Sequence, residues 1–230
     1  MELSIRLQAV ADLISDDLAV ADVGTDHGYI PIYLLKTQKC KKAFAMDINE
    51  GPLLRAKEHI GMHGLSDKIE TRLSDGVKAL QAGEAECVVV AGMGGALSIK
   101  IMEEGEEVFR SLKEFVLQPQ SEIEKVRQYL CRHGYQIVAE DMVLDDGKFY
   151  PMMKVKNGQD SEYSLMELRY GKYLLEQKNP ILKMFLEKEV QTKQRILDNL
   201  AAAAGEHIKV RRNALQEEQH CAKEALSVYL

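Results

Sequence analysis

Short hydrophobic runs recur through the first two-thirds of the chain, each bounded by turn residues and followed by a stretch with helical spacing. This alternation is typical of βαβ units and predicts a parallel sheet with helices filling the gaps between strands. Apolar residues three and four positions apart also predict an amphipathic helix over Leu3 to Ile14. The predicted strands are Leu18 to Val23, Ala43 to Ile48, Ile69 to Leu73, Glu86 to Ala91 and Glu114 to Leu117.

The pattern changes after a helix that we expect at Ser121 to His133. Two extended runs follow, Tyr135 to Leu144 and Phe149 to Val155, and Asp145-Asp146-Gly147-Lys148 separates them. An Asp-Gly pair between two such runs predicts a β-hairpin. Five strands of βα type and this hairpin together predict an α/β fold with a seven-stranded, mostly parallel sheet.

The strand pattern ends at a polar, glycine-containing linker, Asn157 to Ser161. Beyond it we expect one helix before Asn179-Pro180, and then two apolar helical stripes separated at Gly205, which predict an antiparallel, coiled-coil-like helical hairpin. The stripes comprise Leu182, Leu186, Val190, Ile196, Leu197 and Leu200, then Ile208, Leu215, Ala222, Ala225 and Leu226. We therefore divide the chain into domains of residues 1–158 and 159–230.

Composition excludes several classes of protein. With 46% hydrophobic and 29% charged residues, the 230-residue chain is expected to fold as a globular protein. No apolar run approaches the roughly 18 residues of a membrane span, and the charged residues near the N-terminus interrupt any signal peptide, so we expect a cytoplasmic location. Four scattered cysteines predict buried free thiols and no metal site. A net charge of −6 means that any nucleic acid must meet a local basic patch.

The loop after the first predicted strand carries acids where an open parallel sheet binds its ligand. It reads Asp22-Val23-Gly24-Thr25-Asp26-His27-Gly28, with two glycines in place of the G-x-G-x-x-G of dinucleotide-binding loops. Asp22 and Asp26 would repel a diphosphate and attract the cationic sulfonium and amino groups of S-adenosylmethionine. The sign of the charge therefore favours this methyl donor over a nicotinamide cofactor.

Residues after the next strands suit an adenosine moiety. Asp47 ends the second strand, where a carboxylate accepts hydrogen bonds from ribose hydroxyls. Asp75-Gly76 follows the third strand and suits the amine and a ring nitrogen of adenine. Met93-Gly94-Gly95 follows the fourth strand and leaves room for a planar ligand or base, and Leu117-Gln118-Pro119-Gln120 supplies amides after the fifth. The sequence therefore predicts one nucleoside site at a single sheet edge.

These residues also have structural alternatives. Gly24 and Gly28 suit a tight turn, Asp26 or His27 could cap the following helix, and Asp47 could be a turn residue at a strand end. We expect Tyr29 to serve packing rather than stacking on a ligand.

Five segments together resemble the bacterial tRNA (adenine-22-N1)-methyltransferase family. They are Gly-Thr-Asp-His-Gly-Tyr-Ile-Pro (24–31), Met-Asp-Ile-Asn (46–49), Ser-Asp-Gly (74–76), Ala-Gly-Met-Gly-Gly (91–95) and Leu-Gln-Pro (117–119). The resemblance includes the first helix and the tail, and so covers nearly the whole chain; at Gly28 the family has a small alanine. It implies a Rossmann-like class I methyltransferase fold with a helical C-terminal domain, S-adenosylmethionine as cofactor, and methylation of N1 of adenine 22 in tRNA.

The resemblance also implies site residues. No Asn-Pro-Pro-Tyr motif follows the fourth strand, which disfavours N6 methylation. Adenine N1 has an in-plane lone pair and needs no strong base, so Asp26 is expected to stabilise the positive charge on adenine and His27 to orient that carboxylate or the base. The expected cofactor-binding residues are Asp22, Gly24, Asp26, His27, Gly28, Asp47, Ile48, Asp75, Gly76, Met93, Gly94 and Gly95.

Basic residues near the crevice and in the tail are expected to bind tRNA, while the helical hairpin clamps it. They are Arg6, Lys36, Lys41, Lys42, Lys209 and Arg211. A solvated helix end explains the lysines equally well. Three other functions stay open at this point: an NAD-dependent oxidoreductase, a non-enzymatic interaction protein, and a methyltransferase of another acceptor. We expect neither a metal nor an obligate protein partner.

Overall fold

The computed structural model describes residues 2–201 and 205–230. The chain divides into two compact units, Met1–Glu162 and Tyr163–Leu230. The first contains all the strands of the described chain, and the second is helical.

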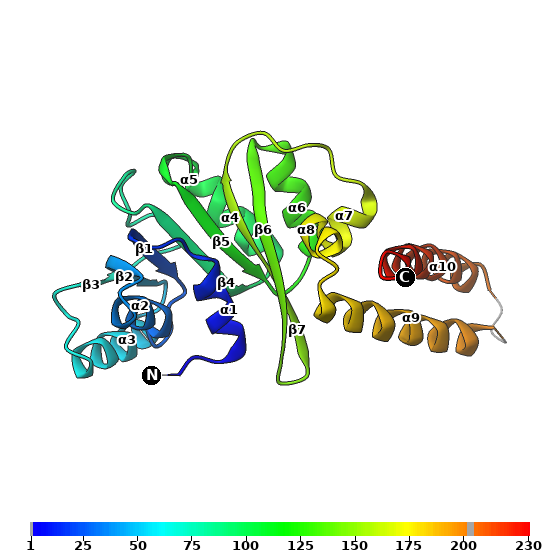
Figure 1. Ribbon diagram of the computed structural model, residues 1–230, viewed down its shortest axis with the longest axis horizontal. Coiled ribbons are helices and arrows are strands. Elements are labelled where there is room, and N and C mark those ends of the chain that lie inside the picture. Colours follow the sequence, from blue (N-terminus) through cyan, green and yellow to red (C-terminus); the bar gives the residue numbers. More distant parts are fainter. Residues whose placement is uncertain (1, 202–204) are drawn as a thin grey trace. The chain divides into compact units, whose positions relative to one another are not determined.

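Unit 1 is built on a seven-stranded sheet with the order β3-β2-β1-β4-β5-β7-β6 (Figure 1). Neighbours from β3 to β5 run parallel, whereas β7 runs antiparallel to both β5 and β6. The strands are β1 (Leu18–Val23), β2 (Cys40–Asp47), β3 (Ile69–Leu73), β4 (Cys87–Met93), β5 (Glu114–Pro119), β6 (Tyr135–Asp145) and β7 (Lys148–Asn157). The predicted mostly parallel sheet with a terminal hairpin is confirmed. Strand order reverses between β1 and β4, and we call the carboxyl ends of these two strands the crevice, because sheets of this kind bind their ligands there.

Helices pack on both faces of this sheet. Alternate strand residues such as Ala43 and Val89 join α1, α2 and α3 in one hydrophobic core. On the opposite face, the ring of Phe109 in α5 meets Phe115 edge-on at 5.1 Å, and Phe115 meets Tyr135 at 5.3 Å. Both faces are buried because successive side chains on a strand point to opposite sides. The helices are α1 (Ile5–Leu13), α2 (Tyr29–Lys36), α3 (Glu50–Met62), α4 (Gly95–Glu104), α5 (Glu106–Ser111) and α6 (Ile123–Arg132).

The prediction of a helix between β3 and β4 is wrong, because the described segment 74–86 forms turns. The Ser74 hydroxyl accepts a hydrogen bond from the Ala79 N–H and donates to the Gly76 carbonyl. Arg72 of β3 donates to both carboxylate oxygens of Glu84, at 2.8 and 2.9 Å. These local side-chain bonds stabilise a turn in place of a helix.

Unit 2 contains the predicted helical hairpin, formed by α9 (Pro180–Leu200) and α10 (Glu206–Ser227). The Asn179 side chain accepts the N–H groups of Ile181 and Leu182 at the start of α9, and proline suits the first helical position. We expected a single helix before Asn179, but the structure has two short helices, α7 (Leu165–Tyr170) and α8 (Lys172–Glu176). The helix is divided because Gly171 between them adopts a φ of 93°.

The cysteines are free thiols. Cys40, Cys87 and Cys221 are buried as expected, but Cys131 is only half-buried. Within residues 2–201 and 205–230, no cluster of three or more His, Cys, Asp or Glu side chains suits a metal ion. The helices in those ranges are also too short or too polar to cross a bilayer.

Candidate functional site

Asp22 points into the protein at the carboxyl end of β1. Its side chain is 4% exposed, and its carboxylate accepts a hydrogen bond from the Thr25 hydroxyl at 2.7 Å. Burial raises the pKa of Asp22 to about 6, and the negative charge of Asp47 adds to this rise. The hydrogen bond from Thr25 and the positive charge of Arg6 act in the opposite direction. A buried carboxylate that ionises near neutral pH favours a cationic ligand beside it.

Gly24 brings the loop after β1 against the loop after β4. Its φ is +75°, and a Cβ at this position would lie 2.5 Å from the terminal methyl carbon of Met93. The N–H groups of Gly24 and Thr25 donate to the Met46 carbonyl of β2, at 2.8 and 2.9 Å. The ends of β1, β2 and β4 therefore meet in one place, as predicted from the sequence.

The residues predicted to hold adenosine lie at the ends of β2 and β3. Asp47 is 8% exposed, and its Oδ1 accepts the Asn49 N–H at 2.8 Å. Ile48 is 60% exposed and offers an apolar surface to a planar ring. Asp75 is exposed, and the hydrogen bond from Lys78 Nζ at 2.5 Å lowers its pKa. Asp47 thus lies at the end of β2, as predicted for a ribose ligand, and also holds the turn after that strand. Asp75 is ionised at neutral pH.

The glycines after β4 permit close contact between two loops. β4 ends at Met93, Gly94 is the N-cap of α4, and Gly95 is its first residue. A Cβ at Gly95 would lie 2.4 Å from the Ser121 carbonyl oxygen, and the Gly95 N–H donates to that oxygen at 3.1 Å. Only glycine allows the backbone after β5 to approach this closely.

Arg6 lies at the same edge, where its side chain is half-buried and held by contacts within unit 1. Its Nη1 donates to Gln118 Oε1 at 3.1 Å, and the Gly92 N–H donates to the same oxygen at 3.1 Å. Its guanidinium also lies 5.5 Å from the centre of the Tyr150 ring, and its backbone N–H donates to Asp145. Arg6 therefore links α1 to the ends of β4 and β5.

Asp26 has the opposite orientation from Asp22. It adopts a left-handed φ of 47°, and its side chain is 58% exposed. Arg55 Nη2 lies 3.0 Å from its Oδ1, and His27 Nε2 lies 3.7 Å away. The N-cap of α2 is Gly28, with no side-chain hydrogen bond at the cap, so the capping alternatives for Asp26 and His27 are wrong.

Several rings gather beside Asp26, and the sequence interpretation named only His27 and Tyr29 among them. Tyr29 is 38% exposed and packs against other rings of the chain, as expected. Its ring stacks on His27 at 5.3 Å and meets His59 edge-on at 5.4 Å. The missed residues Arg55, His59 and His63 lie four positions apart on α3, and this spacing was the available signal for one helix face.

The predicted lysines lie at the wrong edge of the sheet. β2 begins at Cys40, earlier than predicted, so Lys41 and Lys42 are at its amino end, and α2 ends at Lys36 after running back from the crevice. Lys41 pairs with Asp17 at 3.3 Å, while Lys42 lies near Glu70 and over the Phe44 ring. Their expected closeness to the switch point is therefore wrong.

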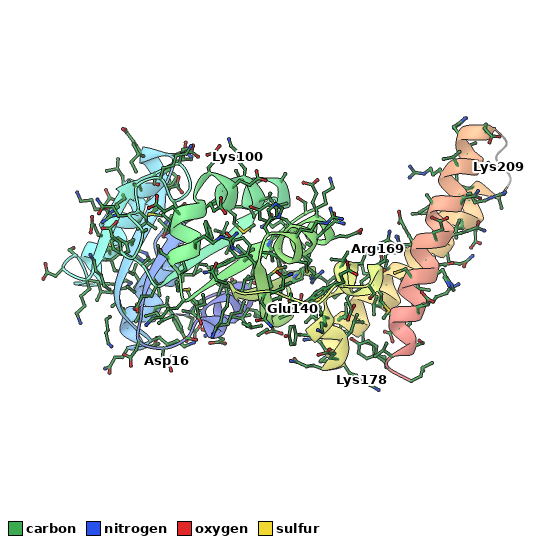
Figure 2. All side chains as sticks on the ribbon, turned by 90° about the horizontal axis from the view of Figure 1, so that it is seen from above. Asp16, Lys100, Glu140, Arg169, Lys178 and Lys209 are labelled. Carbon is green, nitrogen blue, oxygen red and sulfur yellow. The ribbon has the colours of Figure 1, made fainter. Side chains whose placement is uncertain are left out.

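In unit 2, Lys209 and Arg211 are exposed toward the amino end of α10, and Figure 2 labels Lys209 there. Their positions leave both side chains available to a ligand of that unit.

A cavity of about 280 Å³ lies between α3 and the edge strand β3. Leu54 and Leu73, which are 59% and 52% exposed, belong to its apolar lining. Because α3 and β3 alone provide its lining residues, this cavity is separate from the crevice between β1 and β4.

Comparison with known proteins gives consistent matches. A family model described as "Methyltransferase domain" matches residues 3–153. The tRNA (adenine(22)-N(1))-methyltransferase of Bacillus subtilis (strain 168) is 32% identical over 98% of this chain and 98% of its own length.

Two solved structures are similar along their whole length. The crystal structure of the B. subtilis M1A22 tRNA methyltransferase TrmK has a TM-score of 0.88 and 31% identity, and the match covers 98% of this chain and 99% of that one. M. capricolum TrmK in complex with the natural cofactor product S-adenosyl-homocysteine has a TM-score of 0.85 and 27% identity, with 99% of each chain covered.

Proposed function

The chain belongs to the tRNA (adenine(22)-N(1))-methyltransferase family, and from this premise we propose how its own residues serve the reaction. It is an S-adenosylmethionine-dependent enzyme that methylates N1 of adenine 22 in tRNA. The observation that carries this conclusion is the match over 98% of both chains, which includes the helical unit as well as the sheet. The nicotinamide alternative has no support.

The donor set at the crevice fits S-adenosylmethionine. Asp22 supplies a buried negative charge for a cationic group, and Asp47 supplies a carboxylate for ribose hydroxyls. The exposed Ile48 side chain would cover one face of the adenine ring, and Asp75 with the Gly76 amide would recognise its edge. We assign Gly24, Gly28 and the segment 93–95 to the same pocket because they follow or end β1 and β4 beside these residues.

Adenine N1 determines which catalytic groups the protein must supply. S-adenosylmethionine supplies an electrophilic methyl group. Since the N1 lone pair lies in the ring plane and carries no proton, no residue has to act as a strong base. The protein must hold the adenine in line and stabilise the positive charge that the ring acquires. Asp26 has the exposed carboxylate for this role, and His27 at 3.7 Å would orient it.

The tRNA has to present an unpaired adenine, because N1 lies on the Watson–Crick edge. We assign Arg6 to the substrate side of the crevice, where Gln118 and Tyr150 hold its guanidinium. Lys209 and Arg211 on the helical hairpin would meet phosphates of the tRNA body. A tRNA substrate also supports the expected cytoplasmic location.

Methylation mapping tests this function directly. The purified chain is incubated with unmodified tRNA and S-adenosylmethionine carrying a labelled methyl group, and the modified nucleotide is located. We expect label only at position 22, as 1-methyladenosine. A tRNA with guanosine at that position is the matched control and should gain no label. Label at another nucleotide, or equal label in the control, would contradict the assignment.

A further inference from the structure

Four ring side chains form a continuous stripe from the loop before α2 to the C-cap of α3, which we call the aromatic stripe: His27, Tyr29, His59 and His63. The ring centroids of His27 and Tyr29 are 5.3 Å apart, those of Tyr29 and His59 are 5.4 Å apart, and those of His59 and His63 are 4.9 Å apart. His59 Nδ1 also lies 3.0 Å from the His27 carbonyl oxygen. The aromatic stripe therefore starts at the loop that carries Asp26 and continues along α3.

A cation stands at each end of the aromatic stripe. Arg55 is half-exposed and pairs with Asp26 at 3.0 Å, which is the crevice end. At the far end, Lys36 Nζ lies 3.0 Å from His63 Nδ1. Desolvation lowers the pKa of His63, and the charges of Lys36 and His59 lower it further, so this ring is neutral at neutral pH and accepts from Lys36. The surface thus presents rings with positive charge on both sides.

We propose that the aromatic stripe binds unpaired nucleotides of the tRNA next to the target adenosine, with nucleobases stacking on its rings and phosphates contacting Arg55 and Lys36. This inference rests on the proposed function, since turning an adenine out of its pair leaves neighbouring bases exposed. Aromatic rings stack on bases of any sequence, and flanking cations add the attraction to phosphate. A phosphate at Arg55 would also compete with Asp26 for the guanidinium and free that carboxylate for the adenine.

The size and position of the aromatic stripe fit a strand of RNA. Its successive ring centroids lie about 5 Å apart, at 5.3, 5.4 and 4.9 Å, so several rings are available to successive bases. A similar pair lies at the C-terminal end of α6, where half-buried Tyr129 and exposed His133 have ring centroids 4.0 Å apart; β6, which follows it, is at the opposite edge of the sheet from β3. His133 therefore provides a matched control of the same chemistry away from the crevice.

The test compares the double variant H59A/H63A, the ring-retaining double variant H59F/H63F and the control H133A. For each full-length protein we would measure the Kd for unmodified tRNA, the KM and kcat of methylation, the Kd for S-adenosylhomocysteine and the melting temperature. Loss of base stacking should raise the tRNA Kd of H59A/H63A roughly tenfold and affect KM more than kcat. H59F/H63F and H133A should stay within threefold of the wild type, and S-adenosylhomocysteine binding should be unchanged throughout.

A charge variant keeps the proposal testable if H59A/H63A folds poorly. K36E should weaken tRNA binding several-fold and reduce the salt slope by about one, while K156E on β7, away from the aromatic stripe, should do neither. Equal tRNA affinity in the wild type, H59A/H63A and K36E would overturn the proposal, as would an equal loss in H59F/H63F. If the wild type binds tRNA but transfers no methyl group, the proposed function fails and the binding comparison still decides the role of the aromatic stripe.

Discussion

Replacing Asp22 by asparagine should stabilise the free protein at neutral pH while weakening cofactor binding. The carboxylate is 4% exposed, and its pKa is raised from 3.8 to about 6. At 1.36 kcal/mol for each pH unit, this rise of about two units corresponds to about 3 kcal/mol. Asparagine keeps an acceptor for the Thr25 hydroxyl and removes the buried charge.

The sign of the effect follows from the raised pKa. Because the folded state holds the proton of Asp22 more tightly than the unfolded state, the contribution of Asp22 to the free energy of unfolding falls as pH rises from about 4 to about 6 and is then constant. The free energy of unfolding of D22N should therefore exceed that of the wild type by up to about 3 kcal/mol at pH 7.5. At pH 4 the difference should be below about 1 kcal/mol, since Asp22 is then protonated in the folded state and only partly ionised in the unfolded state.

Urea unfolding at both pH values measures this difference, with D75N as the matched control. Asp75 lies at the same sheet edge but is exposed, and Lys78 lowers its pKa, so D75N should gain no stability at pH 7.5. A D22N protein no more stable than the wild type at pH 7.5, or equally stabilised at pH 4, would refute the reasoning.

Cofactor binding supplies the second half of the test. S-adenosylmethionine should bind the wild type about tenfold more weakly at pH 5 than at pH 7.5, because Asp22 must first lose its proton. D22N should bind weakly at both pH values, with no such dependence. At pH 5, where Asp22 of the free wild type carries a proton, calorimetry in two buffers of different ionisation enthalpy should show proton release on cofactor binding. D22N should show no such release.

Three further predictions test other parts of the site. D26N should lower kcat for tRNA methylation at least a hundredfold and change the Kd for S-adenosylhomocysteine less than threefold; equal losses would make Asp26 a cofactor ligand. G95A should lose about 1–3 kcal/mol in urea unfolding, because its Cβ would meet the backbone after β5, whereas G51A on the exposed face of α3 should be neutral or slightly stabilising. K209E/R211E should weaken tRNA binding several-fold in a filter assay without altering S-adenosylhomocysteine binding, and unchanged tRNA affinity would remove the helical hairpin from the substrate interface.

The sheet was predictable because hydrophobic runs report directly on buried strands. β1 and β3 occupy the predicted residues, Leu18–Val23 and Ile69–Leu73. The errors arose where individual residues, and not the spacing of hydrophobic residues, determine the secondary structure. Arg72 and Glu84 hold segment 74–86 in turns, and Gly171 splits the helix before Asn179 into two. Neither effect has a signature in hydrophobic spacing.

The location of the site could be predicted from the sequence, but the orientations of its side chains could not. Parallel strands end at one edge, so Asp22, Asp47 and Asp75 could be assigned to it from the sequence alone. Which acids face inward depends on the backbone path between them. Likewise, the pairing of Asp26 with Arg55 joins a loop and a helix that are distant in sequence, and no local pattern reports it.

The two acids of the first loop have different physical tasks because of these orientations. Asp22 is charged and buried before any ligand arrives, so the cofactor side of the crevice is ready in the free protein. Asp26 is instead exposed and held by Arg55, so its charge is partly neutralised until a competing anion occupies the guanidinium. A tRNA phosphate is such an anion, and the carboxylate would then become available only when the adenine that needs it is present. This coupling joins recognition of the RNA strand to stabilisation of the methylated base.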